Sequence, residues 1–446
     1  MTPRDDPSSP GGHRPYAAFA EPAFRHFMVG TLLARIGTGA QAMAIGWEIY
    51  IRTDDNAMAL AMVGLVQAIP MLVLTLPAGY LADVMDRRRL ILTGLLGTTL
   101  TSLALAQYSY MEGSILAMYI LLFFDASFLR LANPARTAIL PLLVPAYKLE
   151  NAMKWRTSLG EIAAITGPVL GGALLYFWIP ACYLFSALST AVFMVFLMFI
   201  HIPPHARSAP GRMLAQVRDG IRFVWQRKVI LGTISLDLFA VLLGGVTMIL
   251  PIFVRQVIDL EDANISEEGA LGLLRAAPAA GALIMALALA HMPPIRKAGR
   301  TMLWSVAGFG VATIVFAISH NLWLSLAMLF LTGAFDNVSV VVRHTLVQLL
   351  TPNEMRGRVS AVNSIFIGSS NQIGGFRAGA VAAAIGAMPS AIIGGIGTLI
   401  VVGLWAWLFP NLRNFGRLTA LDHPATDPAP SRSRLRETPQ STTKTR

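Results

Sequence analysis

The sequence predicts an all-α integral membrane protein with twelve transmembrane helices in two pseudo-symmetric six-helix bundles. The 446 residues are 55% hydrophobic and only 13% charged, and their mean hydropathy is +0.60, values that are wrong for a soluble protein. Apolar segments long enough to cross a hydrocarbon core of about 30 Å recur along the whole chain. The second half also repeats a pattern of the first half.

The apolar segments place the expected spans at 24–51, 57–83, 89–109, 114–143, 149–177, 179–201, 229–258, 267–291, 301–319, 321–350, 355–386 and 388–410. They divide into a bundle over 24–201 and a bundle over 229–410. The linker over 202–228 contains GRMLAQVRDGIRFVWQRK, which has the periodicity of an amphipathic helix at a membrane surface. Residues 1–23 form a tail, and residues 411–446 are expected to be disordered because Pro, Ser, Thr and Arg dominate them.

The distribution of charge orients these helices. The net charge is +11, and most Lys and Arg residues lie in the tails and in the loops on one side. The opposite loops carry acidic residues such as Asp54, Asp259 and Glu261, with Arg52 as their basic residue. Because basic loops stay in the cytoplasm, we expect both termini there and a multi-pass protein of the cell inner membrane. The basic excess therefore indicates orientation, and no nucleic-acid partner is expected.

Several chemical classes are excluded by the motifs that the sequence lacks. The polar start MTPRDDPSSPGGHRPY has no apolar core or cleavage site of a signal peptide. Cys182 is the one cysteine, which leaves no disulfide or cysteine-based metal site in a monomer. No GxxxxGKS loop, HExxH motif or dinucleotide fingerprint occurs. We therefore expect no cofactor, no metal and no enzymatic activity, and energy would come from an ion gradient.

The two halves repeat without a gap at a shift of 207 residues. The paired stretches are PARTAILPLLVPAYKLENAMKWRTSLGEIAAITGPVLGG and VVRHTLVQLLTPNEMRGRVSAVNSIFIGSSNQIGGFRAG. The shift aligns Arg136 with Arg343 and Gly167 with Gly374. Parallel repeats of six helices are typical of one large class of secondary transporters.

The loop after the second span reads GYLADVMDRRRLIL and contains Gly79, Asp83, Arg88 and Arg89. A Gly, an Asp four residues later and a following basic cluster resemble the signature of the major facilitator superfamily. That resemblance implies a gating motif that serves the conformational cycle. The alternative is that these arginines only mark the cytoplasmic side.

A second resemblance covers the chain from Phe24 to Pro410. The stretches FRHFMVGTLLARIG, LAMVGLVQAIPMLVLTLPAGYLAD and TPNEMRGRVSAVNSIFIGSSNQIGGFRAG are similar to the facilitator branch that contains the enterobactin exporter and related efflux proteins. Relatives usually carry acidic residues where this chain has Gly375 and Arg377. Because those acids are replaced here, ion or substrate chemistry that the relatives place on the eleventh span does not carry over directly to this chain.

Small residues in the fifth span predict close helix packing. GPVLGG resembles the end of a motif shared by proton-driven drug antiporters, whose upstream glycines are replaced here by Lys154 and Ala163. Without the family, the spacing still predicts a stripe on which a neighbouring helix can approach closely. The helix-packing residues are Gly160, Gly167, Pro168, Gly171 and Gly172.

Polar residues within the spans are the candidate substrate and proton site. A charge at the membrane centre costs about 2.5–3.5 kcal/mol on insertion scales, so it usually faces a partner or a watery cavity. Mutual neutralisation inside a bundle is the structural alternative for each residue. The candidates are Arg35, Glu48, Asp125, Arg130, Glu161, Asp237, Asp336, Arg343, Asn371 and Gln372.

Helical spacing relates some of these charges. Asp336 and Arg343 are seven residues apart and share one helix face at about 10 Å. Asp125 and Arg136, eleven apart, share a face of the equivalent helix, with Pro134 between them. The superfamily resemblance implies that spans 1, 4, 7 and 10 line a central cavity. A paired, cavity-facing charge system in which protons and substrate compete is therefore expected.

The sequence predicts a secondary active transporter that alternates access around this cavity. By resemblance it exports a small amphipathic molecule, such as a siderophore or drug, in exchange for protons, and works as a monomer in the bilayer. An importer or uniporter of the same fold remains an alternative. So does a transport-inactive membrane sensor or assembly partner.

Overall fold

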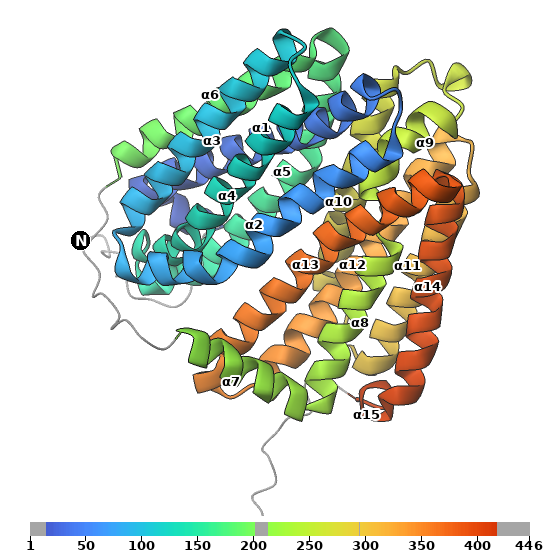
Figure 1. Cartoon of the computed structure of the whole chain (residues 1–446). Coiled ribbons are helices and arrows are strands. Elements are labelled where there is room, and N and C mark those ends of the chain that lie inside the picture. Colours follow the sequence, from blue (N-terminus) through green and yellow to red (C-terminus); the bar gives the residue numbers. More distant parts are fainter. Residues whose placement is uncertain (1–14, 201–212, 294, 417–446) are drawn as a thin grey trace, which may run out of the picture.

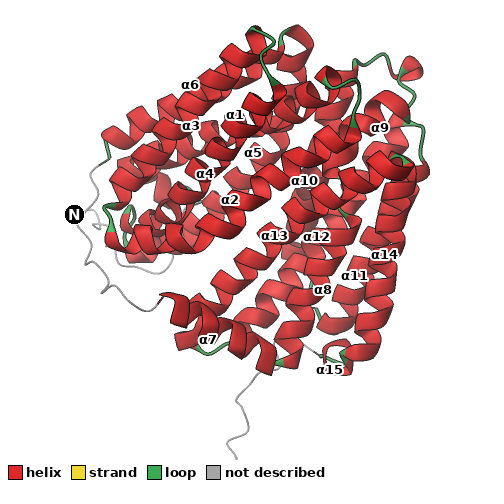
Figure 2. Cartoon of the chain, in the orientation of Figure 1, coloured by secondary structure: helices red, strands yellow, loops and turns green. Residues whose placement is uncertain are grey.

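The computed structural model describes residues 15–200, 213–293 and 295–416, and this part of the chain is built from helices without β-strands (Figures 1 and 2). The expected tails lie mostly outside these residues, as does the first part of the linker. Residues 411–416, which the sequence assigned to the C-terminal tail, are described. They include most of α15, Pro410–Arg413, whose Leu412 is buried.

Four of the first six long helices begin at recognisable start signals. Asn56 Oδ1 accepts hydrogen bonds from two backbone amides of α2, and Asp86 Oδ1 accepts one from the amide of Arg89 in α3. Pro22 and Pro180 occupy the first turns of α1 and α6. These helices form the first helix set: α1 Pro22–Arg52, α2 Ala57–Val84, α3 Arg87–Tyr110, α4 Ile115–Ile139, α5 Leu149–Phe177 and α6 Ile179–Met198.

The later helices form the second helix set: α8 Lys228–Gly244, α9 Leu250–Gln256, α10 Glu267–His291, α11 Ala298–Ile318, α12 Leu322–Leu350, α13 Asn353–Ile385 and α14 Ala387–Leu408. The amphipathic helix expected in the linker is α7, Met213–Gln226, which packs on α13. There Arg358 forms an ion pair of 3.2 Å with Asp219.

The span expected at 229–258 is not one continuous helix. It contains α8, a short 3-10 turn at Thr247–Ile249, and α9. The break follows Gly244 and Gly245, which are poor helix formers. Arg377 of α13 supports the broken end, because its Nε donates to Leu242 O at 2.9 Å and its Nη2 donates to Leu243 O.

Ten helical segments in the described residues are long and apolar enough to cross a membrane. They coincide with ten of the twelve expected spans, and the two spans without such a segment correspond to α1 and α13. Those two helices have 31 and 33 residues, so their length suffices, but they are more polar. The chain is therefore an integral membrane protein.

Most helix contacts occur within each set. In the first set α1 packs on α5 and α6, and α3 packs on α4 and α6; in the second set α12 packs on α10 and α11, and α14 packs on α8 and α11. Two long contacts join the sets, α5 with α10 and α2 with α13, and α7 also touches α2. Figure 1 shows the two sets as adjoining groups of helices.

The contacts between the sets concentrate toward the α1–α2 end, defined here by the loop 53–56 and by α9. A Cβ on Gly172 of α5 would lie 2.6 Å from Glu268 O of α10, and a Cβ on Gly379 would lie 2.7 Å from Ala61 Cβ of α2. Arg255 forms an ion pair of 3.2 Å with Asp55 across the sets. The helices can approach this closely only because glycines stand at the contacts.

Candidate functional site: an arginine pocket

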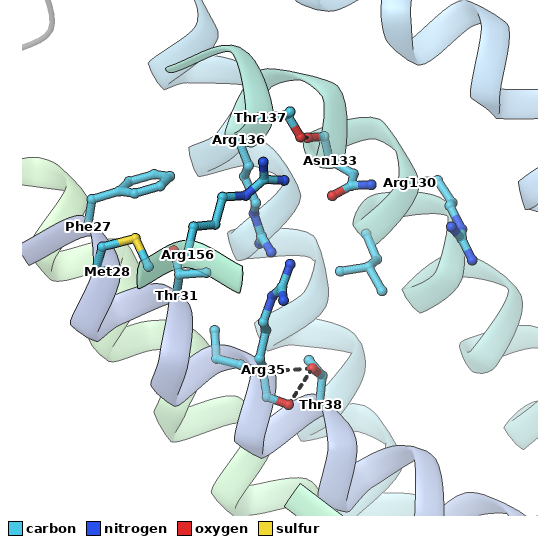
Figure 3. A pocket seen from close by; sticks show the side chains of 12 residues that line it. Phe27, Met28, Thr31, Arg35, Thr38, Arg130, Asn133, Arg136, Thr137 and Arg156 are labelled. Atoms are coloured by element: carbon cyan, nitrogen blue, oxygen red, sulfur yellow. Dashed lines mark hydrogen bonds between the residues drawn. The ribbon is translucent and has the colours of Figure 1, made fainter. Parts of the chain in front are cut away.

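A pocket of about 220 Å³ lies among α1, α4 and α5 (Figure 3). We call it the arginine pocket because four guanidinium groups line it together with apolar and uncharged polar side chains. Its lining residues are Phe27, Met28, Thr31, Ala34, Arg35, Thr38, Leu129, Arg130, Asn133, Arg136, Thr137 and Arg156.

Three of the arginines extend toward the same space. Figure 3 shows Arg35 reaching in from α1, Arg136 from α4 and Arg156 from α5, whereas Arg130 lies beyond Asn133 on α4. The positive charge of Arg35 is close enough to repel those of Arg136 and Arg156. Among the described residues, none of the four arginines has an ion-pair partner within 4 Å. The pocket therefore concentrates positive charge that no ion pair within the described residues neutralises.

Two buried polar atoms of this pocket lack hydrogen-bond partners within the described part of the chain. They are Arg136 Nε and Thr31 Oγ1. The Arg136 guanidinium lies over the ring of Phe193 at 5.4 Å, a cation–π contact that fixes its orientation. Buried polar groups are normally hydrogen-bonded, so these two atoms are unsatisfied groups on side chains that line the pocket, although neither atom faces the cavity directly.

Asp125 and Arg136 both have neighbours on α1, Gln41 and Arg35 respectively, but they lie at different depths along α4. Asp125 is buried and accepts hydrogen bonds from Thr101 of α3, at 2.9 Å, and from Gln41 of α1. It is not among the pocket's lining residues, whereas Arg136 is. Eleven residues span about 16 Å along a helix axis at 1.5 Å per residue, so depth alone separates Asp125 from the pocket, and a shared face of α4 stays a prediction.

Arg343 forms its ion pair with Asp237 of α8, not with Asp336 on its own helix. The pair lies inside the second helix set, and the Arg343 side chain is 2% exposed. Asp336 is half-buried on α12 and has no ion pair among the described residues. Asp237 and Arg343 therefore connect α8 to α12 through one buried charge pair.

Glu48 belongs to a separate buried cluster near the α1–α2 end. Tyr183 of α6 donates to its Oε2 at 2.8 Å, and Arg52 forms an ion pair of 3.0 Å with its Oε1. Arg52 also donates to Gly113 O in the loop after α3. These bonds tie α1, α6 and the α3–α4 loop together away from the arginine pocket.

The remaining candidates have different surroundings. Glu161 of α5 is attracted to Arg35 and lies beside the arginine pocket without lining it. Asn371 is exposed and donates to Ile367 O of its own helix at 2.8 Å. Gln372 is half-buried at the α2–α13 contact, where its carbonyl would lie 3.1 Å from a Cβ on Gly64.

The loop between α2 and α3 is held mainly by arginine side chains. Arg88 donates to Met198 O at the end of α6 at 2.6 Å, and Arg87 donates to Ala138 O of α4 at 3.0 Å. Gly79 is half-buried, and Asp83 and Arg89 are exposed. Within the described residues no side-chain bond of Asp83 occurs.

The fifth-span glycines lie at two helix contacts. Gly167 and Gly171 face α1, where added Cβ atoms would lie 3.2 Å from Gly39 Cα and 3.0 Å from Ala40 Cα, and Pro168 and Gly172 face α10. Gly160 lies under Arg35, whose Nη1 would be 2.8 Å from a Cβ there. A larger side chain at Gly160 would therefore displace a guanidinium of the pocket.

Sequence reasoning missed Arg156, Asn133 and the orphaned Thr31 as lining residues. Arg156 stood in the basic segment KWR at the start of a span, where a basic residue is explained by orientation alone. Lys154 belongs to the same segment and is exposed, so the local sequence does not distinguish the two basic residues. Only the packing of α5 against α1 turns Arg156 inward.

Comparison with known proteins agrees with this architecture. A family model described as transmembrane secretion effector matches residues 13–430. The chain is 26% identical over 410 residues to an enterobactin exporter of Citrobacter koseri, covering 88% of this chain and 93% of that protein. An enterobactin exporter of Escherichia coli strain K12 is 25% identical, with the same coverage.

Solved structures share the fold at much lower identity. A nucleoside transporter superposes with a TM-score of 0.70 at 12% identity, covering 87% of this chain and 99% of that chain. A POT family transporter in complex with 5-aminolevulinic acid gives a TM-score of 0.68 at 12% identity, covering 87% and 96%. With the membrane helices and the family match together, the chain belongs to the transmembrane secretion effector family of major facilitator superfamily transporters.

Proposed function

We propose that this transporter is a proton-coupled exporter of a small amphipathic molecule, with a siderophore as the leading class. The enterobactin exporters that it resembles support the direction and the substrate class. In this proposal the two helix sets are six-span bundles over 24–201 and 229–410, α8 and α9 together make one span, and both termini are cytoplasmic.

The observation that carries alternating access is the difference between the two ends of the molecule. Toward the α1–α2 end, glycine contacts and the Arg255–Asp55 pair bring the sets together. Toward the opposite end, exposed polar side chains stand on helices of both sets: Thr157 and Ser158 on α5, and Ser360 and Ser364 on α13. Polar side chains on membrane helices normally face water or protein. This arrangement supports a conformation that opens the arginine pocket to the cytoplasm.

The buried Asp237–Arg343 pair is the proposed site of proton coupling. A proton on Asp237 would neutralise one partner and leave Arg343 without its counter-charge inside the second set. An unpaired buried charge is unfavourable, so protonation would favour a rearrangement of α12 against α8. The loading and release of that proton would link the pH gradient to the change of access.

Flux through reconstituted vesicles tests this function. Purified protein is placed in proteoliposomes with enterobactin as the first probe, and the lumen is made acidic. Antiport predicts that the probe accumulates inside and that a protonophore abolishes the accumulation. Uptake driven by an acidic exterior would indicate an importer, and uptake that ignores the gradient a uniporter. The same assay is repeated with a panel of metabolites that a deletion strain retains. If none of them moves across the membrane, the transport-inactive alternative is favoured.

The coupling residue is tested in the same vesicles. Asp237→Asn should remove the response to the pH gradient while downhill flux persists, because the amide does not titrate. Asp219→Asn is the matched control, since Asp219 also pairs with an arginine but on the surface helix α7. Gradient-driven accumulation that survives Asp237→Asn would exclude this pair as the coupling site.

A further inference from the structure

We propose that the arginine pocket selects an organic anion, binding a carboxylate or sulfonate that is carried on an apolar body. The inference rests on the proposed transport function and specifies the substrate class that the pocket accepts. It assigns the anion to Arg35, Arg136 and Arg156, with Arg130 at the edge.

The charge of the pocket requires an occupant of opposite sign. Four arginines line it, and the nearby carboxylate of Glu161 is attracted to one of them, Arg35. Repulsion between Arg35 and its neighbours Arg136 and Arg156 disfavours the empty pocket. Guanidinium groups bind carboxylates and similar oxyanions through two parallel hydrogen bonds, which makes them suited to this task.

Unused hydrogen-bonding atoms point to the same ligand. Arg136 Nε and Thr31 Oγ1 are buried and lack partners within the described residues; they belong to side chains that line the pocket, and rotation of either side chain would turn the group toward an occupant. An N–H group and a hydroxyl group can both donate to an oxyanion. A cation would leave the N–H unsatisfied and add to the repulsion, so the donors and the charges agree on an anion.

The remaining walls explain why the anion should be organic. Phe27, Met28, Ala34 and Leu129 supply an apolar surface beside the guanidinium groups. The volume of about 220 Å³ is smaller than the ~300–1,000 Å³ of sites that enclose a whole drug-sized ligand. The pocket therefore fits the charged end of a larger molecule, and the rest of that molecule would extend into the space between the helix sets.

Binding is tested separately from transport on the purified full-length protein in detergent. The probes are 2-naphthoate and its uncharged amide, 2-naphthamide, and the readout is the thermal unfolding midpoint as a function of probe concentration, because ligands that bind the folded state raise it. Naphthoate should raise the midpoint and naphthamide should not. Equal responses to the two probes would overturn the proposal.

Two further arms separate the possible sources of an oxyanion. Inorganic phosphate tests for charge alone, and a short-chain phosphatidylglycerol tests for a lipid headgroup. Both should bind more weakly than naphthoate. If either one stabilises the protein as strongly as naphthoate at the same concentration, the site recognises phosphate or lipid and the organic-anion proposal is wrong.

Arginine variants locate the site. Arg136→Gln and Arg35→Gln should each weaken naphthoate binding about tenfold or more, since each removes a charge-assisted hydrogen bond. Arg300→Gln on α11 is the control and should bind as wild type. Arg35 is exposed, so Arg35→Gln should fold and should measure the effect on naphthoate binding even if Arg136→Gln fails to fold. Wild-type affinity in Arg35→Gln would overturn the assignment, whereas lost flux with intact naphthoate binding would count only against the transport function.

Discussion

At the scale of single residues, three acidic side chains inside the helices are satisfied in three different ways. Glu48 has an ion pair and a tyrosine donor, Asp237 has an ion pair with Arg343, and Asp125 has only the uncharged donors Thr101 and Gln41. Since removing one partner of a buried pair leaves an uncompensated charge, these residues should differ in what their loss costs.

The Asp237–Arg343 pair gives the sharpest stability prediction. Asp237→Ala should lower the thermal unfolding midpoint strongly, because an isolated buried arginine costs about 3–5 kcal/mol. The double variant Asp237→Ala with Arg343→Met should recover much of that loss, since no unpaired charge remains. Thermal unfolding in detergent measures both.

Asp219→Ala provides the comparison for that measurement. Its pair with Arg358 is partly exposed, and such pairs contribute about 0–1 kcal/mol. Its loss should therefore change the midpoint little. If Asp237→Ala lowers the unfolding midpoint as little as Asp219→Ala does, the Asp237–Arg343 contact contributes less to stability than predicted here.

Sequence reasoning identified which charges lie within the helices but not their partners. Glu48, Asp125, Asp237 and Arg343 were all singled out, because a charge in an apolar segment is visible without a structure. The partner depends on how each helix is rotated against its neighbours. A spacing of seven residues predicted that Asp336 and Arg343 share one face of α12. The packing of α8 against α12 instead brings Asp237 close enough to Arg343 to form the ion pair.

At the scale of the helices, the break between α8 and α9 is the main departure from the expected spans. The other spans were predicted from apolar length alone, and their starts are fixed locally by caps such as Asn56 and Asp86. The break needs a long-range partner, because its free carbonyls are satisfied by Arg377, 135 residues away from Leu242 in the chain. A basic side chain at a helix C-terminus is also favoured by the helix dipole, whereas an acid there would be repelled.

Substitution of Arg377 tests this account of the break. Arg377→Met should lower the thermal unfolding midpoint, since two carbonyls lose their donors at about 1–3 kcal/mol for each group left unsatisfied. Arg377→Lys keeps the charge but not the two-pronged geometry, so its unfolding midpoint should lie between those of Arg377→Met and the wild type. Arg356→Met, an exposed arginine on the same helix, is the control. A midpoint for Arg377→Met equal to that of the control would contradict a supporting role at α8.

At the scale of the whole molecule, the proposed transport cycle makes the balance between the two ends decide which side of the membrane reaches the arginine pocket. The cross-set pair Arg255–Asp55 has side chains 33% and 31% exposed, so it contributes at most about 1 kcal/mol. The glycine contact between α5 and α10 is buried and leaves no room for a side chain, since Gly172 and Gly272 approach each other directly. In this proposal, steric packing at these glycines contributes more than the surface ion pair to holding the α1–α2 end together.

The last prediction follows from that comparison. Gly172→Leu should force α5 away from α10, because even a Cβ would lie 2.6 Å from Glu268 O, and the population should shift toward opening at the α1–α2 end. A cysteine at the pocket, Thr38→Cys in a Cys182→Ala background, should then react faster with a membrane-impermeant maleimide added from that side.

Gly403→Leu on α14 is the matched control, because a Cβ there meets nothing within 4 Å, and its labelling should equal that of the parent. Arg255→Gln should raise the labelling rate only slightly, up to about fivefold, as expected for a pair contributing at most about 1 kcal/mol. A larger effect from Arg255→Gln than from Gly172→Leu would reverse the ranking and make the charge pair the principal lock.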